Sequence, residues 1–224
     1  MLGLQILQRK RAISLSLAHQ FLEVPVSNVS DCMSRMFAAG PTLRPMHQGN
    51  PMAGPALTVR VRPGDNLMVH KALHLATPGD VIVVDGGGDL TNALIGEIMS
   101  SIAQSRGVAG MVIHGAVRDA SALRASPFPI FAAGVTHRGP YKDGPGEINT
   151  KIAIDGMVIE PGDLVIGDAD GVLCVPIDEA EKVLAAAKAK SAVEAQSLAA
   201  IASGTYNTAW IDEALARLKC PIES

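Results

Sequence analysis

Two short, unbroken apolar segments in the middle of the chain constrain the fold most. They are "DVIVVD" at residues 80–85 and "GMVIHG" at residues 110–115, and glycine or proline lies close to each. Strands without polar alternation suit a sheet that is covered on both faces. Between them, residues 98–103 carry apolar side chains at helical spacing. A strand, a helix and a second strand in this order predict a β-α-β unit with parallel strands, and hence an α/β fold.

Further apolar segments and repeated turns extend this prediction. "ALTVRVR", "PIFAAG", "DLVIGD" and "VLCVP" predict additional strands. The tripeptide Pro-Gly-Asp occurs at 63–65, 78–80 and 161–163, and twice it opens a similar phrase, "PGDVIVVD" and "PGDLVIGD". Proline fixes φ and glycine supplies a positive φ, so we interpret these tripeptides as tight turns that lead into strands.

Both ends of the chain have helical character. Residues 1–22 predict a helical extension, and "VSNVSDCMSRMFAAG" predicts a short helix with Ser30 or Asp31 near its start and Gly40 at its end. Residues 178–202, rich in Ala, Lys and Glu, predict one long helix.

After Gly204 the tail predicts another short helix. Its Trp210, Ile211 and Leu215 would form a costly apolar patch if they stayed in water. We therefore expect this tail to dock on a partner subunit.

Composition argues against several classes of protein. The 19 basic and 22 acidic residues give a net charge of −3, and the chain has four Phe, two Tyr and one Trp, so we expect no nucleic-acid binding. No apolar run reaches the roughly 18 residues of a membrane span, so we expect no membrane association. Three cysteines without a close pair are typical of reduced thiols, and we expect a cytoplasmic protein.

Two motifs suggest chemistry but have simpler explanations. "VVDGGGDL", residues 83–90, lacks the spacing of a dinucleotide-binding loop, so we interpret it as a strand that runs into a turn. His70 and His74 have helical i, i+4 spacing but lack the Glu of a metallohydrolase, so packing on a helix is the simpler interpretation. His114, among apolar neighbours, is more typical of a core histidine than of a ligand.

A helix start and a charged pair predict an anion site. Gly96 begins the helix between the two apolar strands, and the free N–H groups of its first turn can bind an anionic group. The following strand runs back and delivers Arg118 and Asp119 to the same end. The residues of the helix start are Gly96, Glu97, Ile98 and Met99.

This predicted geometry suits a small 2-oxo acid. Its carboxylate would bind the helix start, the guanidinium of Arg118 would bridge the carboxylate and the keto oxygen, and Asp119 would anchor a divalent cation bound to both. Taken alone, these residues leave the alternative that Arg118 and Asp119 form an ordinary surface ion pair.

Three long phrases resemble one family. "GDNLMVHKALHLATPGDVIVVDGGG", "IGEIMSSIAQSRGVAGMVIHGAVRDASALRASPFPIFAAGVTHRGP" and "VIEPGDLVIGDADGVLCVP" are similar to the family that contains 4-hydroxy-4-methyl-2-oxoglutarate aldolase and the regulator of ribonuclease activity A. The resemblance implies a swivelling β/β/α domain with β-α-β units over residues 23–177, and helical extensions at 1–22 and 178–224. It also implies a homotrimer or homohexamer with sites between subunits.

The resemblance assigns roles to the predicted site. The backbone from Gly96 through Glu97 and Ile98 to Met99 would bind pyruvate. Arg118 would contact pyruvate and stabilise its enolate. Asp119 would bind Mg²⁺ or Mn²⁺, with Glu97 helping to hold metal-bound waters.

One position departs from the family pattern. Ala122 replaces an acidic residue that the aldolases usually carry three positions after the aspartate, and loss of such a carboxylate can weaken metal binding. Glu194 is the residue that we would test as the acid supplied by a neighbouring copy.

The implied function is that of a divalent-metal-dependent class II pyruvate aldolase. It would cleave 4-hydroxy-2-oxo acids of the 4-hydroxy-4-methyl-2-oxoglutarate type to pyruvate, and would decarboxylate oxaloacetate through the same enolate. The alternative is a non-catalytic regulator of the same family that binds a ribonuclease or a helicase.

Overall fold

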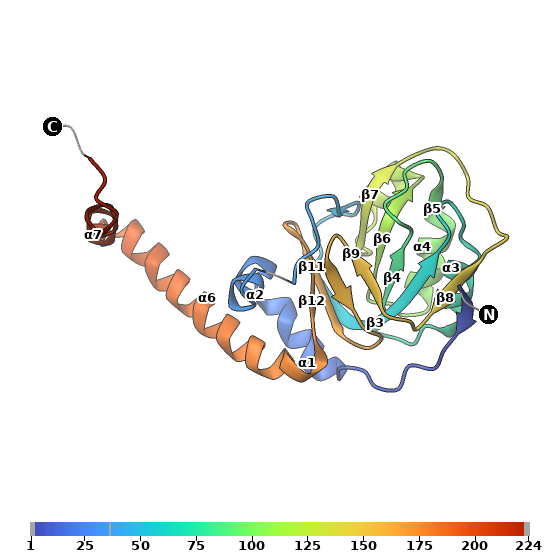
Figure 1. Ribbon diagram of the computed structural model, residues 1–224, viewed down its shortest axis with the longest axis horizontal. Helices are drawn as coiled ribbons and strands as arrows, with labels where there is room; N and C mark the ends of the chain where they lie inside the picture. The colour runs from blue at the N-terminus through green and yellow to red at the C-terminus, as the bar shows by residue number, and fades with distance from the viewer. Residues whose placement is uncertain (1–2, 36, 222–224) are drawn as a thin grey trace. The chain divides into compact units, whose positions relative to one another are not determined.

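The computed structural model describes residues 3–35 and 37–221. They fall into two units, residues 1–187 and residues 188–224. The first unit is a mixed α/β domain built on a sheet in which ten described strands pair, as Figure 1 shows in blue to orange. The predicted α/β class is therefore confirmed.

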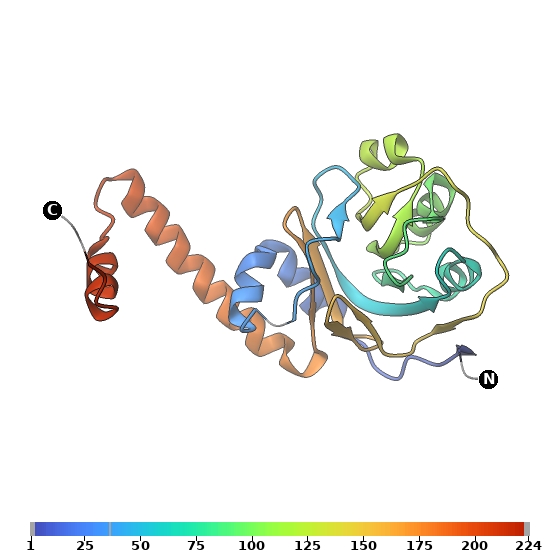
Figure 2. The ribbon, with the colours of Figure 1, turned by 45° about the horizontal axis from the view of Figure 1, so that its top comes forward.

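The centre of the sheet consists of four parallel strands. β3 (Met52–Val61), β4 (Val81–Asp85), β6 (Gly110–Val117) and β7 (Ile130–Val135) are neighbours in that order. In register, Val83 of β4 lies between Thr58 and Val112. Helices α3 (Leu67–Leu75) and α4 (Glu97–Ser105) pack on one face of these strands (Figure 2). The predicted β-α-β unit is confirmed, with α4 between β4 and β6.

The other face of the sheet is covered by strands. The hairpin of β9 (Ile152–Ile154) and β10 (Met157–Ile159) buries its apolar residues together with those of β4, β6 and β7. β11 (Leu164–Asp168) pairs with β12 (Gly171–Val175) and with β3. Burial from both sides explains why the central strands are apolar throughout.

The remaining elements complete the domain. They are β1 (Leu4–Ile6), α1 (Leu15–Gln20), a 3-10 turn at Phe21–Glu23, α2 (Val26–Cys32), β2 (Arg44–Pro45), β5 (Ala93–Ile95), α5 (Ala120–Ala125), β8 (Gly146–Ile148) and a second 3-10 turn at Ile177–Glu179.

The N-terminal segment differs from the prediction. A helix is present, but it covers only Leu15–Gln20, whereas residues 4–6 form β1, which pairs with β8 in parallel. The extended chain between them allows Arg9 to reach Asp80, with Nη1 2.7 Å from Oδ1. These tertiary contacts outweigh the local helical pattern. Residues 1 and 2 lie outside the described part.

The next helix also begins at a different residue. We expected Ser30 or Asp31 near its start, but α2 begins at Val26, directly after Pro25, and ends at Cys32. Pro25 is the residue before the first turn, and its carbonyl accepts the N–H groups of Asn28 and Val29. Asp168 Oδ2 accepts the N–H of Val26 at 2.9 Å, which explains the earlier start because it satisfies a free donor of the first turn. The predicted end at Gly40 is also wrong, and Met36 in this stretch lies outside the described residues.

The three Pro-Gly-Asp tripeptides form turns as predicted, and their aspartates are buried. The glycines have φ of 75°, 89° and 90° in chain order. Asp65, Asp80 and Asp163 are 0, 1 and 6% exposed, and each carboxylate accepts backbone N–H groups. The aspartate side chains thus replace water as partners of these turns.

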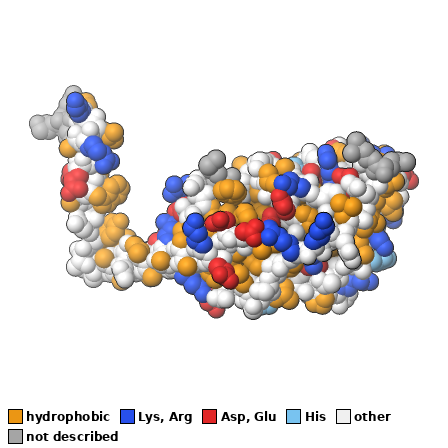
Figure 3. All heavy atoms as spheres, turned by 60° about the horizontal axis from the view of Figure 1, so that its bottom comes forward, with side chains coloured by type: hydrophobic (Ala, Val, Ile, Leu, Met, Phe, Trp, Pro, Cys, Tyr) orange, Lys and Arg blue, Asp and Glu red, His pale blue; other side chains and the backbone are white. Residues whose placement is uncertain are grey.

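The C-terminal helices are confirmed. α6 covers Ala180–Ala202 and α7 covers Ala209–Arg217. Large apolar side chains of the second unit are exposed, and Figure 3 shows hydrophobic side chains among charged ones along it. They are Val193, Leu198, Ile201, Tyr206, Trp210, Ile211 and Leu218, whereas Leu215 is half-buried. Within the described residues, no helix combines the length and the apolar character needed to cross a bilayer.

Candidate functional site

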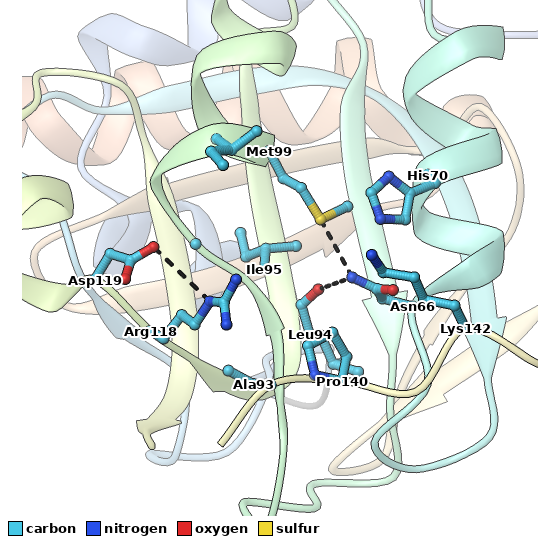
Figure 4. A pocket seen from close by; sticks show the side chains of 13 residues that line it. Asn66, His70, Ala93, Leu94, Ile95, Met99, Arg118, Asp119, Pro140 and Lys142 are labelled. Carbon is cyan, nitrogen blue, oxygen red and sulfur yellow. Dashed lines mark hydrogen bonds and ion pairs between the residues drawn. The ribbon is translucent and has the colours of Figure 1, made fainter. Parts of the chain in front are cut away.

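A cavity of about 330 Å³ opens at the carboxyl end of β6, beside the start of α4. Figure 4 shows Arg118 and Asp119 on one side and residues of α3 and of the loop before β8 on the other. Its lining residues are Asn66, His70, Ala93, Leu94, Ile95, Gly96, Ile98, Met99, Arg118, Asp119, Gly139, Pro140 and Lys142. Most of the predicted site residues therefore meet in one cavity, as the β-α-β geometry requires.

Gly96 allows the carboxylate of Asp119 to reach the start of α4. Asp119 Oδ2 accepts a hydrogen bond of 3.0 Å from the backbone N–H of Glu97. A Cβ atom on Gly96 would overlap this oxygen and would lie 2.9 Å from Cγ of Arg118. The close approach, and not a positive φ, therefore requires glycine at this position.

Asp119 has an unusual backbone conformation. Its φ and ψ are 57° and 38°, in the left-handed region, at the turn between β6 and α5. Aspartate tolerates this region better than most residues, but the conformation still carries strain. The turn directs the carboxylate toward α4, and no described residue donates a hydrogen bond to its second oxygen, Oδ1.

Arg118 lies beside the same helix start. Its backbone N–H donates to the carbonyl of Ile95 at 3.0 Å, which joins the end of β6 to β5. Its Nε lies 3.9 Å from Asp119 Oδ2, and both side chains are 44% exposed. A pair so long and so exposed contributes little stability. The guanidinium is accordingly available to an anionic ligand.

Glu97 is placed differently from the other predicted residues. Its N–H group is engaged by Asp119, its side chain is exposed, and it does not line the cavity. Its role in holding metal-bound waters remains a prediction. Ala122 lies in α5, and Glu194 lies in the second unit, where its Oε1 is 3.4 Å from Nζ of Lys190.

The far wall of the cavity was not predicted. Asn66 precedes α3, His70 lies on α3, and Lys142 lies in the loop before β8. We interpreted His70 as a packing residue, but it lines the cavity, whereas His74 does not. Burial lowers the pKa of His70, and the nearby Lys142 lowers it further. The histidine therefore favours its neutral form at neutral pH.

The donors that a cation would meet are few. No cluster of three or more His, Cys, Asp or Glu side chains suited to a metal occurs among the described residues. Mg²⁺ and Mn²⁺ accept a single carboxylate together with water and substrate oxygens, whereas an enclosed zinc site needs several protein ligands. Asp119, with Oδ1 unengaged, fits a cation of the first kind.

His114 lies outside the cavity and between two carboxylates. Its Nδ1 is 3.5 Å from Asp85 Oδ1 and its Nε2 is 3.6 Å from Asp155 Oδ1, distances that are long for hydrogen bonds but suit ion pairs. Asp85 raises the pKa of His114, and Asp155 adds to the effect. The histidine is half-buried, as part of an ionic cluster and not of an apolar core.

Comparison with known proteins identifies the family. Residues 26–174, about two thirds of the chain, match the RraA-like family, described as Aldolase/RraA. The chain belongs to the RraA-like family. Gly96, Arg118 and Asp119 all lie within the matched residues.

Similar proteins include one that is named as an aldolase and one that is named as an RNA-processing inhibitor. A protein of Halalkalibacterium halodurans, provisionally named 4-hydroxy-4-methyl-2-oxoglutarate aldolase, is 44% identical over 77% of this chain and 82% of its own length. An uncharacterized protein from Pseudomonas syringae has a TM-score of 0.77 at 26% identity, over 86% of this chain and 95% of that one. The RNA-processing inhibitor RraA from Thermus thermophilus has a TM-score of 0.63 at 34% identity, over 68% of this chain and 92% of that one.

Proposed function

We propose that the protein is a divalent-metal-dependent lyase that cleaves 4-hydroxy-2-oxo acids, of the 4-hydroxy-4-methyl-2-oxoglutarate type, to pyruvate. The observation that carries the proposal is the meeting of Arg118, Asp119 and the start of α4 in one cavity. The aldolase name of the 44% identical relative supports it.

The chain's own residues would bind and orient the 2-oxo acid. The N–H groups of Ile98 and Met99 at the start of α4 would hold its carboxylate at the positive end of the helix dipole. The guanidinium of Arg118 would contact the keto oxygen, on which negative charge develops. Asp119 would hold Mg²⁺ or Mn²⁺, which when bound would supply a Lewis acid for that oxygen.

The proposed reaction breaks the bond between C3 and C4. Its electron pair forms the enolate of pyruvate, the 4-hydroxyl loses its proton, and O4 becomes the carbonyl oxygen of the second product. The enolate then takes a proton at C3. We assign Glu97 to proton transfer through water, because it is the acidic residue that directly follows Gly96. Loss of CO₂ from oxaloacetate gives the same enolate, so we also propose oxaloacetate decarboxylation.

The proposal is tested with purified protein, oxaloacetate and Mg²⁺. We expect pyruvate release that a chelator stops, and a loss of about 100- to 1000-fold in Arg118→Ala, the size typical for removing a group that stabilises a developing oxyanion. Asp119→Ala should abolish the response to added metal. Lys151→Ala, an exposed site outside the cavity, is the control. Pyruvate release that is unchanged by the chelator and by the substitutions at Arg118 and Asp119 would refute the proposal.

A second candidate is a non-catalytic regulator that binds a ribonuclease or a helicase. Two observations favour it: Ala122 in place of the usual acidic residue, and the likeness to the RNA-processing inhibitor RraA. A protein that released no pyruvate under any of these conditions and bound such a partner would support this candidate.

We further propose that the protein works as a homotrimer or homohexamer. The exposed apolar side chains of the second unit support association with further copies. Glu194 of a neighbouring copy is the proposed additional acid at the site.

A further inference from the structure

We propose that Asn92 is a positioning residue for Arg118. Its side-chain amide holds the backbone of Gly139 beside the guanidinium and occupies the carbonyl of Gly139, so that the guanidinium stays free to bind a 2-oxo acid. The inference rests on the proposed function and extends it to a residue that does not line the cavity.

The backbone at Gly139 packs against the guanidinium of Arg118. A Cβ atom on Gly139 would lie 3.3 Å from Nη1 of Arg118, which is closer than an ordinary van der Waals contact. Both residues line the cavity. A guanidinium has five N–H donors and no acceptor, so a backbone carbonyl beside it competes with a substrate oxygen for those donors. The carbonyl of Gly139 is such a competitor.

Asn92 removes this competitor by donating to it. Its Nδ2 lies 2.5 Å from the carbonyl oxygen of Gly139, which makes a short hydrogen bond. Asn92 is half-buried, and the backbone of Gly64 packs so closely against it that a Cβ atom there would lie 3.3 Å from Cβ of Asn92. The amide therefore has little room to turn away from Gly139.

The guanidinium keeps its donors available as a result. In the described part of the chain it makes no hydrogen bond, and its ion pair with Asp119 is long, with 3.9 Å between Nε and Oδ2. Figure 4 shows the side chain of Arg118 directed into the cavity. An anionic ligand can therefore take up the guanidinium without first breaking a hydrogen bond within the protein.

Backbone hydrogen bonds hold the loop on both sides of Gly139. The carbonyl of Arg138 accepts a backbone N–H at 2.9 Å, and the N–H of Tyr141 donates to a backbone carbonyl at 2.8 Å. Among the described residues, the hydrogen bond to Gly139 itself comes from the side chain of Asn92. A substitution at Asn92 can therefore remove this bond and leave the backbone anchors of the loop in place.

Loss of the amide should turn the guanidinium toward the loop. The carbonyl of Gly139 would then need another donor, and a charged donor beside it forms a stronger hydrogen bond than a neutral one. Arg118 would donate to Gly139 and move away from the position of the keto oxygen. A displacement of about 1 Å in a group that acts on the transition state can cost about 100-fold in rate.

The kinetic test follows pyruvate release from oxaloacetate with Mg²⁺ in three variants. Asn92→Leu keeps the shape of the side chain but has no donor, and we expect it to lower kcat about 10-fold and to change KM less than about 3-fold. Asn92→Gln keeps the amide and should restore most of kcat. Thr91→Ala removes an exposed hydrogen bond to Asp89 in the same loop and should behave like the unaltered protein.

The effect of Asn92 in the absence of Arg118 separates positioning from a general structural role. In the Arg118→Ala background, Asn92→Leu should lower kcat less than about 2-fold, because no guanidinium remains to be positioned. A thermal unfolding curve shows whether each variant is folded. An equal loss of kcat in both backgrounds, or an unchanged kcat in Asn92→Leu, would overturn the inference.

A crystal structure of Asn92→Leu gives an answer that does not depend on catalysis. We expect a terminal nitrogen of Arg118 to donate to the carbonyl of Gly139 in this variant. An unmoved guanidinium overturns the role of Asn92 whether or not the protein releases pyruvate. If the guanidinium has turned but the unaltered protein releases no pyruvate, the positioning of Arg118 is supported and the proposed function alone fails.

Discussion

Replacing Gly96 with alanine should displace the carboxylate of Asp119. The added Cβ would overlap Oδ2 and lie 2.9 Å from Cγ of Arg118, so the carboxylate must move away from the start of α4. That movement breaks the 3.0 Å hydrogen bond from Glu97 N. A hydrogen bond to a charged group contributes about 1.5–3 kcal/mol, and its half-exposed position reduces this to about 1–2 kcal/mol.

The expected loss is measurable in two ways. For a chain of this length, about 1–2 kcal/mol lowers Tm by about 2–8 °C in a thermal unfolding experiment followed by circular dichroism. Misplacing the proposed metal ligand should also weaken Mg²⁺ binding about 10- to 100-fold in calorimetry.

A double-mutant cycle provides the control. In the Asp119→Ala background the carboxylate is absent, so Gly96→Ala should cost about 1 kcal/mol less than in the unaltered protein. An equal loss in the free energy of unfolding in both backgrounds would show that the carboxylate of Asp119 does not require glycine at position 96. Unchanged Mg²⁺ affinity in Gly96→Ala would contradict the role given to the contact.

Three further predictions concern other parts of the molecule. Asp85 raises the pKa of His114, so the stabilisation from the charged imidazole is fully present below about pH 6.5 and is lost as pH rises through the folded pKa. In urea unfolding, the free energies of unfolding of His114→Gln and of the unaltered protein should therefore differ more at pH 6 than at pH 8.5. An equal difference at the two pH values would contradict this. Phe131 is fully buried, and Phe131→Ala should cost about 3–5 kcal/mol in the same assay. Replacing Trp210 and Ile211 with serine should reduce the particle size in light scattering without changing Tm; an unchanged size would refute docking through α7.

The strands and the first half of the site follow from local patterns. Unbroken apolar segments predicted β4 and β6, and helical spacing predicted α4 between them. Glycine at position 96 and the charged pair at 118 and 119 were predicted to meet because a β-α-β unit has one geometry. These features depend on residues close together in the sequence.

The N-terminal segment and α2 show where local patterns failed. Residues 4–6 pair with β8, far away in the sequence, and Arg9 reaches Asp80. Neither partner is visible in the periodicity of the N-terminal residues. At α2, the carboxylate of Asp168, far away in the sequence, accepts the N–H of Val26, and the capping pattern at Ser30 and Asp31 does not show this partner.

The sequence by itself determined the α/β class, the Pro-Gly-Asp turns and the pairing of Arg118 and Asp119 with the start of α4. Only the tertiary structure decided that Asn66, directly before α3, and Lys142, from a loop 76 residues later, form the opposite wall. The reason is physical. Periodicity and turn chemistry act over a few residues, whereas the far wall depends on how Asp65, buried by the fold, fastens one distant loop to α3.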